Sequence, residues 1–414
     1  MSTFLVCLLA AGTLAGILLR PRQWPEAVWA CLGAALLVGL RLIPVADALR
    51  AAASGMPVYL FLTGMMLLAE LARRAGVFNW LAAHAVRGAR GSRMRLFLLV
   101  YAVGTLVTVF LSNDATAVVL TPAVHAAARK ARVDPLPYLL ICAFIANAAS
   151  FVLPISNPAN LVVYGAALPP LAVWLRLFAL PSALSIAATY AVLRRLSRRE
   201  LAGGVGAAPP PPRLTPVGRR AAWGIAATGV LLLAVSLAGI DLGWPTCTAA
   251  LVVAATAAWN APGEWRAIAR GVSWSVLPLV AGLFVLVAAL EAQGAARMLG
   301  GALQHLAGMG PIAGRLGASF GVAGLCNVMN NLPSGLLTRG ALRQVAVPGL
   351  APALLIGVDL GPNLSVTGSL ATVLWLVSLR REGVTVSGWE FLKRGVLVMP
   401  PALLLATLAT AWTG

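Results

Sequence analysis

The residues of this sequence best suited to chemistry lie in one short polar stretch within a long apolar region. The stretch covers residues 110–122 and places the amide of Asn113 beside the carboxyl group of Asp114. Residues 94–111 and 136–153, on either side, are apolar enough to cross a bilayer, which takes about 20 apolar residues per helix. We therefore expect both polar groups at membrane depth. An ionisable group there is costly unless it faces water or a partner, and its default interpretation is functional.

The composition predicts a membrane protein. Of 414 residues, 60% are hydrophobic and 10% are charged, and the mean hydropathy is +0.89. A soluble domain carries about a quarter charged residues. Roughly a dozen apolar runs predict an all-α, polytopic protein, and several runs are too short to span alone, so breaks and re-entrant pieces are expected. Residues 3–19 lack a basic start and predict a first transmembrane helix rather than a cleaved signal.

The net charge of +19 does not indicate a nucleic-acid partner. The Lys and Arg residues are spread over short loops between apolar runs, which is the pattern of positive-inside topology signals. We therefore expect a multi-pass protein of the cell (inner) membrane. The five cysteines are scattered without metal-ligand spacing, so no metal site and no cofactor are expected.

A polar segment divides the chain into comparable halves. Residues 194–220 are rich in Arg and Pro and predict an extended or disordered cytoplasmic linker. Residues 1–193 then form a first transmembrane repeat and residues 221–414 a second.

Two polar motifs occur in the same order in both halves. Asn113 follows Gly76 at nearly the same separation as Asn330 follows Gly294. Further on, Pro158-Ala-Asn160-Leu corresponds to Pro362-Asn363-Leu. Paired halves with interrupted hydrophobic segments at corresponding places point to a secondary transporter.

The polar breaks predict a binding site. A helix broken at membrane depth leaves unpaired N–H and C=O groups, which are tolerated only where they line a cavity or bind something. Asparagine amides donate and accept hydrogen bonds, which suits a polar neutral ligand or a partly dehydrated ion. The alternative for these amides is hydrogen bonding between helices. The substrate-binding residues we expect are Asn113, Thr116, Asn160, Asn330, Asn331 and Asn363.

Four carboxyl groups lie within or at the edge of apolar runs. Asp114 and Asp359 lie in the breaks, one in each half, and are the expected proton-coupling residues. A carboxyl group in a dry site can take up and release a proton near neutral pH, although each could instead cap a half-helix. Glu70 and Glu291 lie at helix ends, where anchoring at the membrane interface is expected. His125 could relay protons, but a lone histidine is more often structural.

The motifs resemble those of the arsenical pump membrane proteins, the arsenite and antimonite efflux permeases of the ion transporter superfamily. The resemblance rests on residues 112–122, on Asn330-Asn331-Leu-Pro333 and above all on residues 357–375, and it extends over most of the chain. The Asn-Asp and Asn-Asn motifs are shared with superfamily members that move sodium, silicate or carboxylates.

This resemblance implies inverted repeats with two re-entrant hairpins, whose tips lie at Asn113-Asp114 and Asn330-Asn331. Two broken helices, at residues 154–160 and 361–368, would face these tips. It also implies export of arsenite or antimonite from the cytoplasm in exchange for protons. The alternative is a sodium/proton or silicate-type transporter of the same superfamily. Relatives further imply a homodimer and, for some, a cytoplasmic arsenical ATPase as partner.

Two other features bear on the cargo and on the class of protein. The scattered cysteines offer no trithiolate site, so arsenite would be recognised as a neutral trihydroxide through hydrogen bonds. Two intramembrane aspartates could also indicate an aspartyl protease. Such proteases carry Gly-x-Gly-Asp, whereas this chain reads Ile356-Gly-Val-Asp359, so no enzyme is expected.

Overall fold

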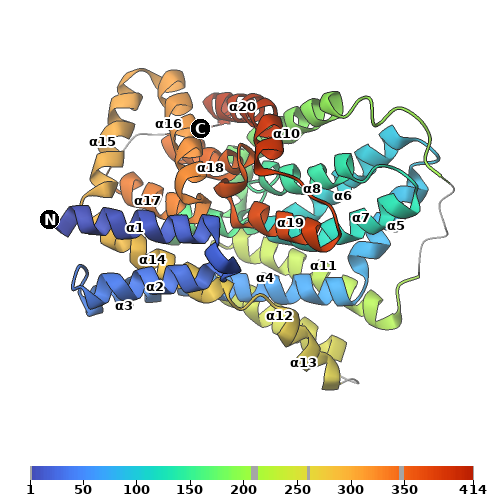
Figure 1. Ribbon diagram of the computed structural model, residues 1–414, viewed down its shortest axis with the longest axis horizontal. Helices are drawn as coiled ribbons and strands as arrows, with labels where there is room; N and C mark the ends of the chain where they lie inside the picture. Colours follow the sequence, from blue (N-terminus) through green and yellow to red (C-terminus); the bar gives the residue numbers. More distant parts are fainter. Residues whose placement is uncertain (1, 207–212, 259–261, 345–348, 414) are drawn as a thin grey trace.

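The computed structural model describes residues 2–206, 213–258, 262–344 and 349–413 (Figure 1). Within these ranges the chain is helical, and a single β-bridge between Ser92 and Gly204 is its nearest approach to a sheet. Seven of the described helices are long and apolar enough to cross a membrane. The all-α, polytopic class expected from the sequence is confirmed.

The two halves of the chain contain the same succession of long and short helices. The first half consists of α1 (Ser2–Leu19), α2 (Glu26–Gly39), α3 (Val45–Ser54), α4 (Met56–Arg74), α5 (Val77–Gly88), α6 (Arg93–Phe110), α7 (Thr121–Lys130), α8 (Leu136–Ala148), α9 (Pro158–Tyr164) and α10 (Leu171–Leu196). The second half consists of α11 (Pro216–Leu237), α12 (Gly243–Ala258), α13 (Pro262–Gly271), α14 (Val276–Ala292), α15 (Ala295–Gly308), α16 (Pro311–Met329), α17 (Asn331–Leu342), α18 (Leu350–Leu360), α19 (Leu370–Arg381) and α20 (Gly388–Thr413).

Helices at corresponding positions make corresponding contacts. Helix α4 packs on α12, and its counterpart α14 packs on α2, while α10 and α20 pack against each other. Helix α5 contacts α6 and α7, as α15 contacts α16 and α17. Figure 1 shows α5 and α15 at opposite ends of the molecule. Equivalent elements therefore face opposite ways.

Each half contains one hairpin that reverses within the apolar layer. Hairpin 1 consists of α6, a π-helical turn η2 (Ala115–Leu120) and α7; hairpin 2 consists of α16 and α17. Ser112 at the first reversal has a φ of 138°, and Asn330 at the second has a φ of 74°. Non-glycine residues seldom adopt positive φ, and such backbone strain tends to occur at functional sites.

Each half also contains one helix that is interrupted after its hairpin. Helix α8 ends at Ala148 and continues only at Pro158 as α9, while α18 ends at Leu360 and α19 begins at Leu370. The segments between are irregular apart from short 3₁₀ turns. Both breaks fall where the polar motifs of the sequence predicted them.

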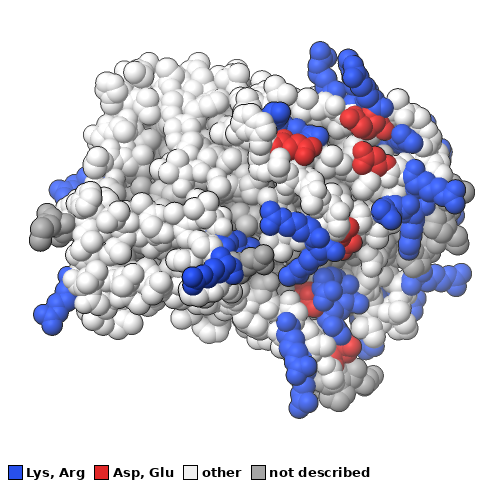
Figure 2. Space-filling view, in the orientation of Figure 1, with Lys and Arg blue, Asp and Glu red and all other residues white. Residues whose placement is uncertain are grey.

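Basic residues gather at one end of the molecule (Figure 2). When the chain is followed helix by helix, the opposite end carries only seven of the 31 Lys and Arg residues, namely Arg41, Arg50, Arg176, Arg297, Arg315, Arg339 and Arg343. By the positive-inside rule, we expect the Arg-rich end to face the cytoplasm. Helix α1 begins at the other end (Figure 1), so we expect its start to face outside. The sequence alone left this orientation open.

The segment between α10 and α11 is partly docked on the Arg-rich end of hairpin 1. The guanidinium of Arg93 donates to the backbone carbonyls of Glu200 and Ala202, both at 3.2 Å, and of Gly204 at 2.9 Å. The N–H groups of residues 205 and 206 donate to the carbonyls of residues 91 and 131. The linker is therefore ordered over residues 200–206 and joins both legs of the hairpin. Its four-proline run, 209–212, lies outside the described residues.

Arg93→Ala is expected to release this docked segment, because three backbone carbonyls lose a charged donor at once. In everted vesicles, trypsin should then cut after Arg198 and Arg199 faster than in the unsubstituted chain. Arg95→Ala is the matched control, since its side chain forms no hydrogen bond with the described residues. Equal cleavage of the two variants would show that Arg93 does not hold the linker.

Candidate functional site

A cavity of about 650 Å³ reaches from the Arg-rich end of the molecule to the tip of hairpin 1. Its inner end is lined by Ser112 and Asp114 of the tip and by Pro158 and Leu370, the first residues of α9 and α19. The cavity therefore joins the hairpin tip to the starts of both half-helices. Its mouth lies at the Arg-rich end, which we expect to face the cytoplasm, and we call it the cytoplasmic cavity.

The carboxyl group of Asp114 is free at the inner end of this cavity. It is partly exposed, and it forms no hydrogen bond or ion pair with any other residue that the structure describes. Its backbone N–H is bound separately by the side-chain oxygen of Asn113 at 2.9 Å. An unpaired carboxyl group at membrane depth that faces water can bind a proton or a cation.

Asn113 and Thr116 belong to the tip of hairpin 1, and both are buried. Asn113 is buried and caps the backbone at Asp114. The Thr116 hydroxyl lies 2.8 Å from the hydroxyl of Thr108 on α6. These two expected substrate residues fix the shape of the tip, and neither lines the cavity.

Asn160 and Asn363 are bound within the two breaks. The amide of Asn160 donates to the carbonyls of Ser150, Leu153 and Pro154 at 2.9, 3.2 and 3.3 Å. Asn363 donates to a carbonyl of α8, at residue 144, and accepts a hydrogen bond from the Asn147 amide, both at 3.0 Å. Buried backbone groups need such partners, so both asparagines stabilise the irregular segments.

Asn330 and Asn331 lie at the tip of hairpin 2, and the structure gives them different surroundings. The side chain of Asn330 accepts from the Leu332 N–H at 3.4 Å and so caps α17. Asn331 is buried, and its side chain forms no hydrogen bond with the described residues. Leu370 lines both the cytoplasmic cavity and a small crevice beside Asn330. The two tips therefore approach each other at the start of α19.

Asp359 occupies a different environment from Asp114. It is fully buried at the end of α18, and one carboxyl oxygen accepts from the Asn157 amide at 2.8 Å. The other oxygen has no partner within the described ranges. Asp359 does not line the cavity. The two expected proton-coupling residues are therefore not brought together at one surface.

A further polar cluster, which the sequence motifs did not predict, surrounds Asn327. Asn327 on α16 donates to the carbonyl of Gly361 at 2.8 Å and accepts from Ser365 at 2.6 Å. The Thr367 hydroxyl donates to the Asn327 carbonyl at 2.8 Å. This cluster ties the second break to hairpin 2. One signal was available, because Asn327 precedes Asn330 by one helical turn and so joins the same motif.

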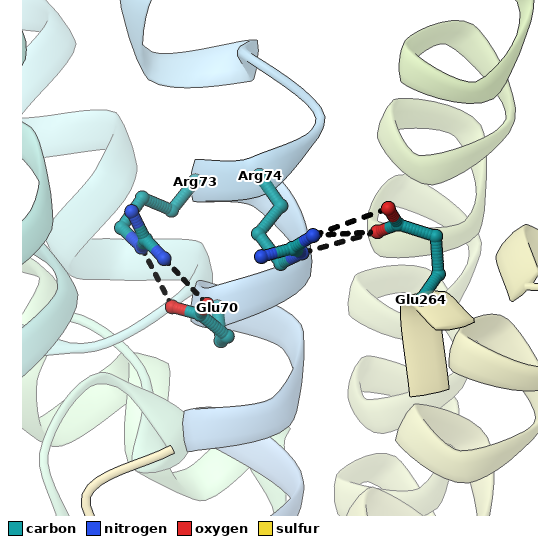
Figure 3. Close-up of polar contacts among 4 residues, drawn as sticks. All are labelled: Glu70, Arg73, Arg74 and Glu264. Atoms are coloured by element: carbon teal, nitrogen blue, oxygen red, sulfur yellow. Dashed lines mark hydrogen bonds and ion pairs between the residues drawn. The ribbon is translucent and has the colours of Figure 1, made fainter. Parts of the chain in front are cut away.

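Charged groups at the mouth of the cavity are mostly paired (Figure 3). Glu70 is buried and binds Arg73 through two hydrogen bonds of 2.7 and 2.6 Å. Arg74 binds Glu264 of α13 at 2.9 to 3.1 Å, which fastens α4 to α13. Glu70 and Arg73 both line the cavity, so this ion pair lies within its wall.

His125, at the same mouth, is not isolated. Its Nδ1 lies 3.1 Å from a carboxyl oxygen of Glu382 at the end of α19. The contact joins hairpin 1 to the second half-helix. Glu382 also lines the cavity.

The helical fold, the paired breaks and a cavity that ends at a hairpin tip are features of a membrane transporter. Residues 14–359 match the model of the family described as citrate transporter, and the chain belongs to this family.

Relatives of known sequence are similar over most of the chain. The arsenical pump membrane protein of Yersinia enterocolitica is 28% identical over 373 residues, which cover 84% of each chain. That of Escherichia coli strain K12 is 28% identical over 374 residues, again with 84% of each chain covered. An uncharacterized transporter of Mycobacterium tuberculosis is 28% identical over 404 residues and 91% of each chain. The resemblance to arsenical pump membrane proteins is thus confirmed.

A solved structure shares the fold. The YdaH transporter of Alcanivorax borkumensis, whose crystal structure is described as revealing an unusual topology, superposes with a TM-score of 0.57. The match covers 91% of this chain and 89% of that one at 15% sequence identity. At this identity the likeness concerns the fold and not the cargo.

Proposed function

We propose that this chain is a secondary active transporter that exports arsenite and antimonite from the cytoplasm by proton antiport. The observation that carries the proposal is the unpaired carboxyl group of Asp114 at the inner end of a cavity that opens at the Arg-rich end. Similarity to arsenical pump membrane proteins over 84% of the chain supports the choice of cargo.

The charges of the cavity disfavour a tricarboxylate cargo. Its basic lining residues are Arg73 and Arg381, both near the mouth, and Arg73 is already bound to Glu70. At the inner end a citrate trianion would meet Asp114, and none of the described residues that line this end is basic. Like charges repel strongly where water is scarce. A neutral trihydroxide such as arsenous acid, or a cation, suits this site better.

Coupling follows from competition for one site. In our proposal Asp114 releases its proton to the cytoplasm and then accepts a hydrogen bond from the cargo. Uptake of a proton from outside would release the cargo there. Proton and cargo then stabilise different orientations of the same polar groups. We assign cargo contacts to Ser112, Asp114 and Asn331. The remaining expected substrate residues support the site, namely Asn113, Thr116, Asn160, Asn330 and Asn363.

A second cavity supports alternating access. It measures about 530 Å³ and is lined by α3, α14 and α17, which correspond to α13, α4 and α7 around the cytoplasmic cavity. It stops short of the tip of hairpin 2. We propose that residues 1–193 and 221–414 are inverted repeats whose two cavities open in turn onto the same site. The protein would act in the cell (inner) membrane, alone or with a second copy or a cytoplasmic ATPase.

The alternative cargo is a sodium ion or a silicate-type hydroxide. An unpaired carboxyl group beside strained backbone at Ser112 offers the oxygen ligands that sodium uses as well as the acceptors for a neutral hydroxide.

Exchange assays on the purified chain in liposomes separate these cargoes. We expect liposomes loaded with arsenite to take up labelled arsenite. Antimonite should inhibit this exchange, and citrate should have no effect on it. Sodium or silicic acid exchange that is insensitive to arsenite would select the alternative. Citrate exchange would overturn the charge argument.

A further inference from the structure

The outer ends of α9 and α17 form a seam that is closed by one arginine. Gly335 of α17 lies against Val162 and Val163 of α9, so close that a Cβ at Gly335 would meet their methyl groups at 3.4 and 3.2 Å. One turn further out, the guanidinium of Arg339 lies directly over Gly165, which follows α9. Gly165 has a φ of 53° and lacks the Cβ that would displace this guanidinium.

Arg339 also borders the outer cavity. This cavity is lined by Glu291 of α14, by Arg343, which directly follows α17, and by Asp47 and Arg50 of α3. Asp47 and Arg50 pair with each other. Glu291 forms no ion pair within the described ranges, and its carboxyl group lies against Gly340, the residue next to Arg339. The carboxyl group of Glu291 therefore lies beside the neighbour of Arg339, but it does not pair with Arg339 in this conformation.

We propose that Arg339 is the outer plug of the transport pathway. Over Gly165 it closes the route from the outer cavity to the tip of hairpin 2 while the cytoplasmic cavity is open. When the site faces outward, the guanidinium leaves Gly165 and pairs with Glu291. This inference rests on the proposed transport function, since it requires that the chain alternates between two orientations. Arg339 acts by position and does not contact cargo.

The test measures access to the tip from outside. Ser334 is fully buried on α17, between Arg339 and the tip of hairpin 2. Its hydroxyl donates to the Asn330 carbonyl at 2.7 Å. Ser334→Cys provides a nearly isosteric reporter in a chain whose exposed Cys7 and Cys31 are replaced by Ala. Intact cells are treated with a membrane-impermeant maleimide, and the labelling rate is measured.

Arg339→Ala is expected to raise the labelling rate at least about tenfold, because removal of the plug favours the outward-open population. Arg343→Ala is the matched control, since Arg343 lines the same cavity without covering Gly165, and its rate should stay at the starting value. Glu291→Gln removes the carboxylate that pairs with Arg339 in the outward-facing state, so it should lower the labelling rate. A purely structural role for Arg339 would not raise the labelling rate in Arg339→Ala and lower it in Glu291→Gln.

Equal rates for Arg339→Ala and Arg343→Ala would overturn the plug, as would a Glu291→Gln rate above that of the starting chain. Labelling needs no cargo, so either outcome would leave the proposed export of arsenite standing. Absence of arsenite transport by the unsubstituted chain would instead overturn the proposed cargo, whereas the labelling rates would still test the plug. If Arg339→Ala fails to reach the membrane, Arg339→Gln carries the same expectation with less loss of side-chain volume.

Discussion

Asp114→Asn is expected to reduce pH-driven arsenite uptake to that of protein-free liposomes while arsenite exchange at equal pH continues. The amide has nearly the size of the carboxyl group and still accepts a hydrogen bond from cargo, but it cannot carry a proton. The measurement compares accumulation under an imposed pH gradient with exchange in its absence, on the same preparation.

Asp359→Asn is the matched control for this expectation. Its amide oxygen can still accept from Asn157, and the residue is buried away from the cavity. We expect this variant to retain pH-driven uptake. If Asp114→Asn accumulates arsenite normally and Asp359→Asn does not, the coupling proton belongs to Asp359.

Asn160→Ala is expected to destabilise the protein, whereas Asn331→Ala should weaken cargo binding alone. Loss of the Asn160 amide leaves the carbonyls of Ser150, Leu153 and Pro154 without this donor. An unsatisfied buried polar group costs roughly 1–3 kcal/mol, so we expect a Tm lower by several degrees and little protein in the membrane. Asn331 supports no described hydrogen bond, so its replacement should raise KM for arsenite without lowering Tm.

Thermal unfolding in detergent and arsenite exchange in liposomes distinguish the two roles. The opposite pattern, a stable Asn160→Ala protein with raised KM and an unstable Asn331→Ala protein, would reverse the assignment of structural and cargo-binding asparagines.

Much of the fold could be predicted because the breaks are visible in the sequence. Asparagine, proline and glycine interrupt otherwise apolar runs, and the cost of unpaired backbone groups in a membrane makes each interruption meaningful. The hairpin tips at Ser112 and Asn330 and the breaks before Pro158 and Leu370 lie within or beside the polar motifs.

The roles of individual asparagines could not be predicted in the same way. The partner of Asn363 is Asn147, which lies in the other half of the chain, and the partners of Asn160 are carbonyls of an irregular segment. Neither set follows from helical periodicity. Asn160 and Asn331 therefore look equivalent in the sequence. In the structure only the Asn160 side chain forms hydrogen bonds with other described residues.

The surroundings of Glu70 depend on long-range packing, which the sequence does not reveal. The residue falls near a helix end, which favours an interfacial position. In the structure Gly271 of the other half packs against its carboxyl group, and Arg73 binds it from the next turn, so it lines the cavity mouth. The docking of residues 200–206 on Arg93 likewise depends on contacts far apart in sequence.

The most direct test of the proposed function is arsenite accumulation under an imposed pH gradient without ATP. The purified chain is placed in liposomes with an acidic interior, and molecules whose cytoplasmic face points outward are assayed. We predict that protons leaving the interior drive arsenite above its external concentration, and that a protonophore abolishes this accumulation. Arsenite that only equilibrates, with or without the gradient, would contradict proton antiport.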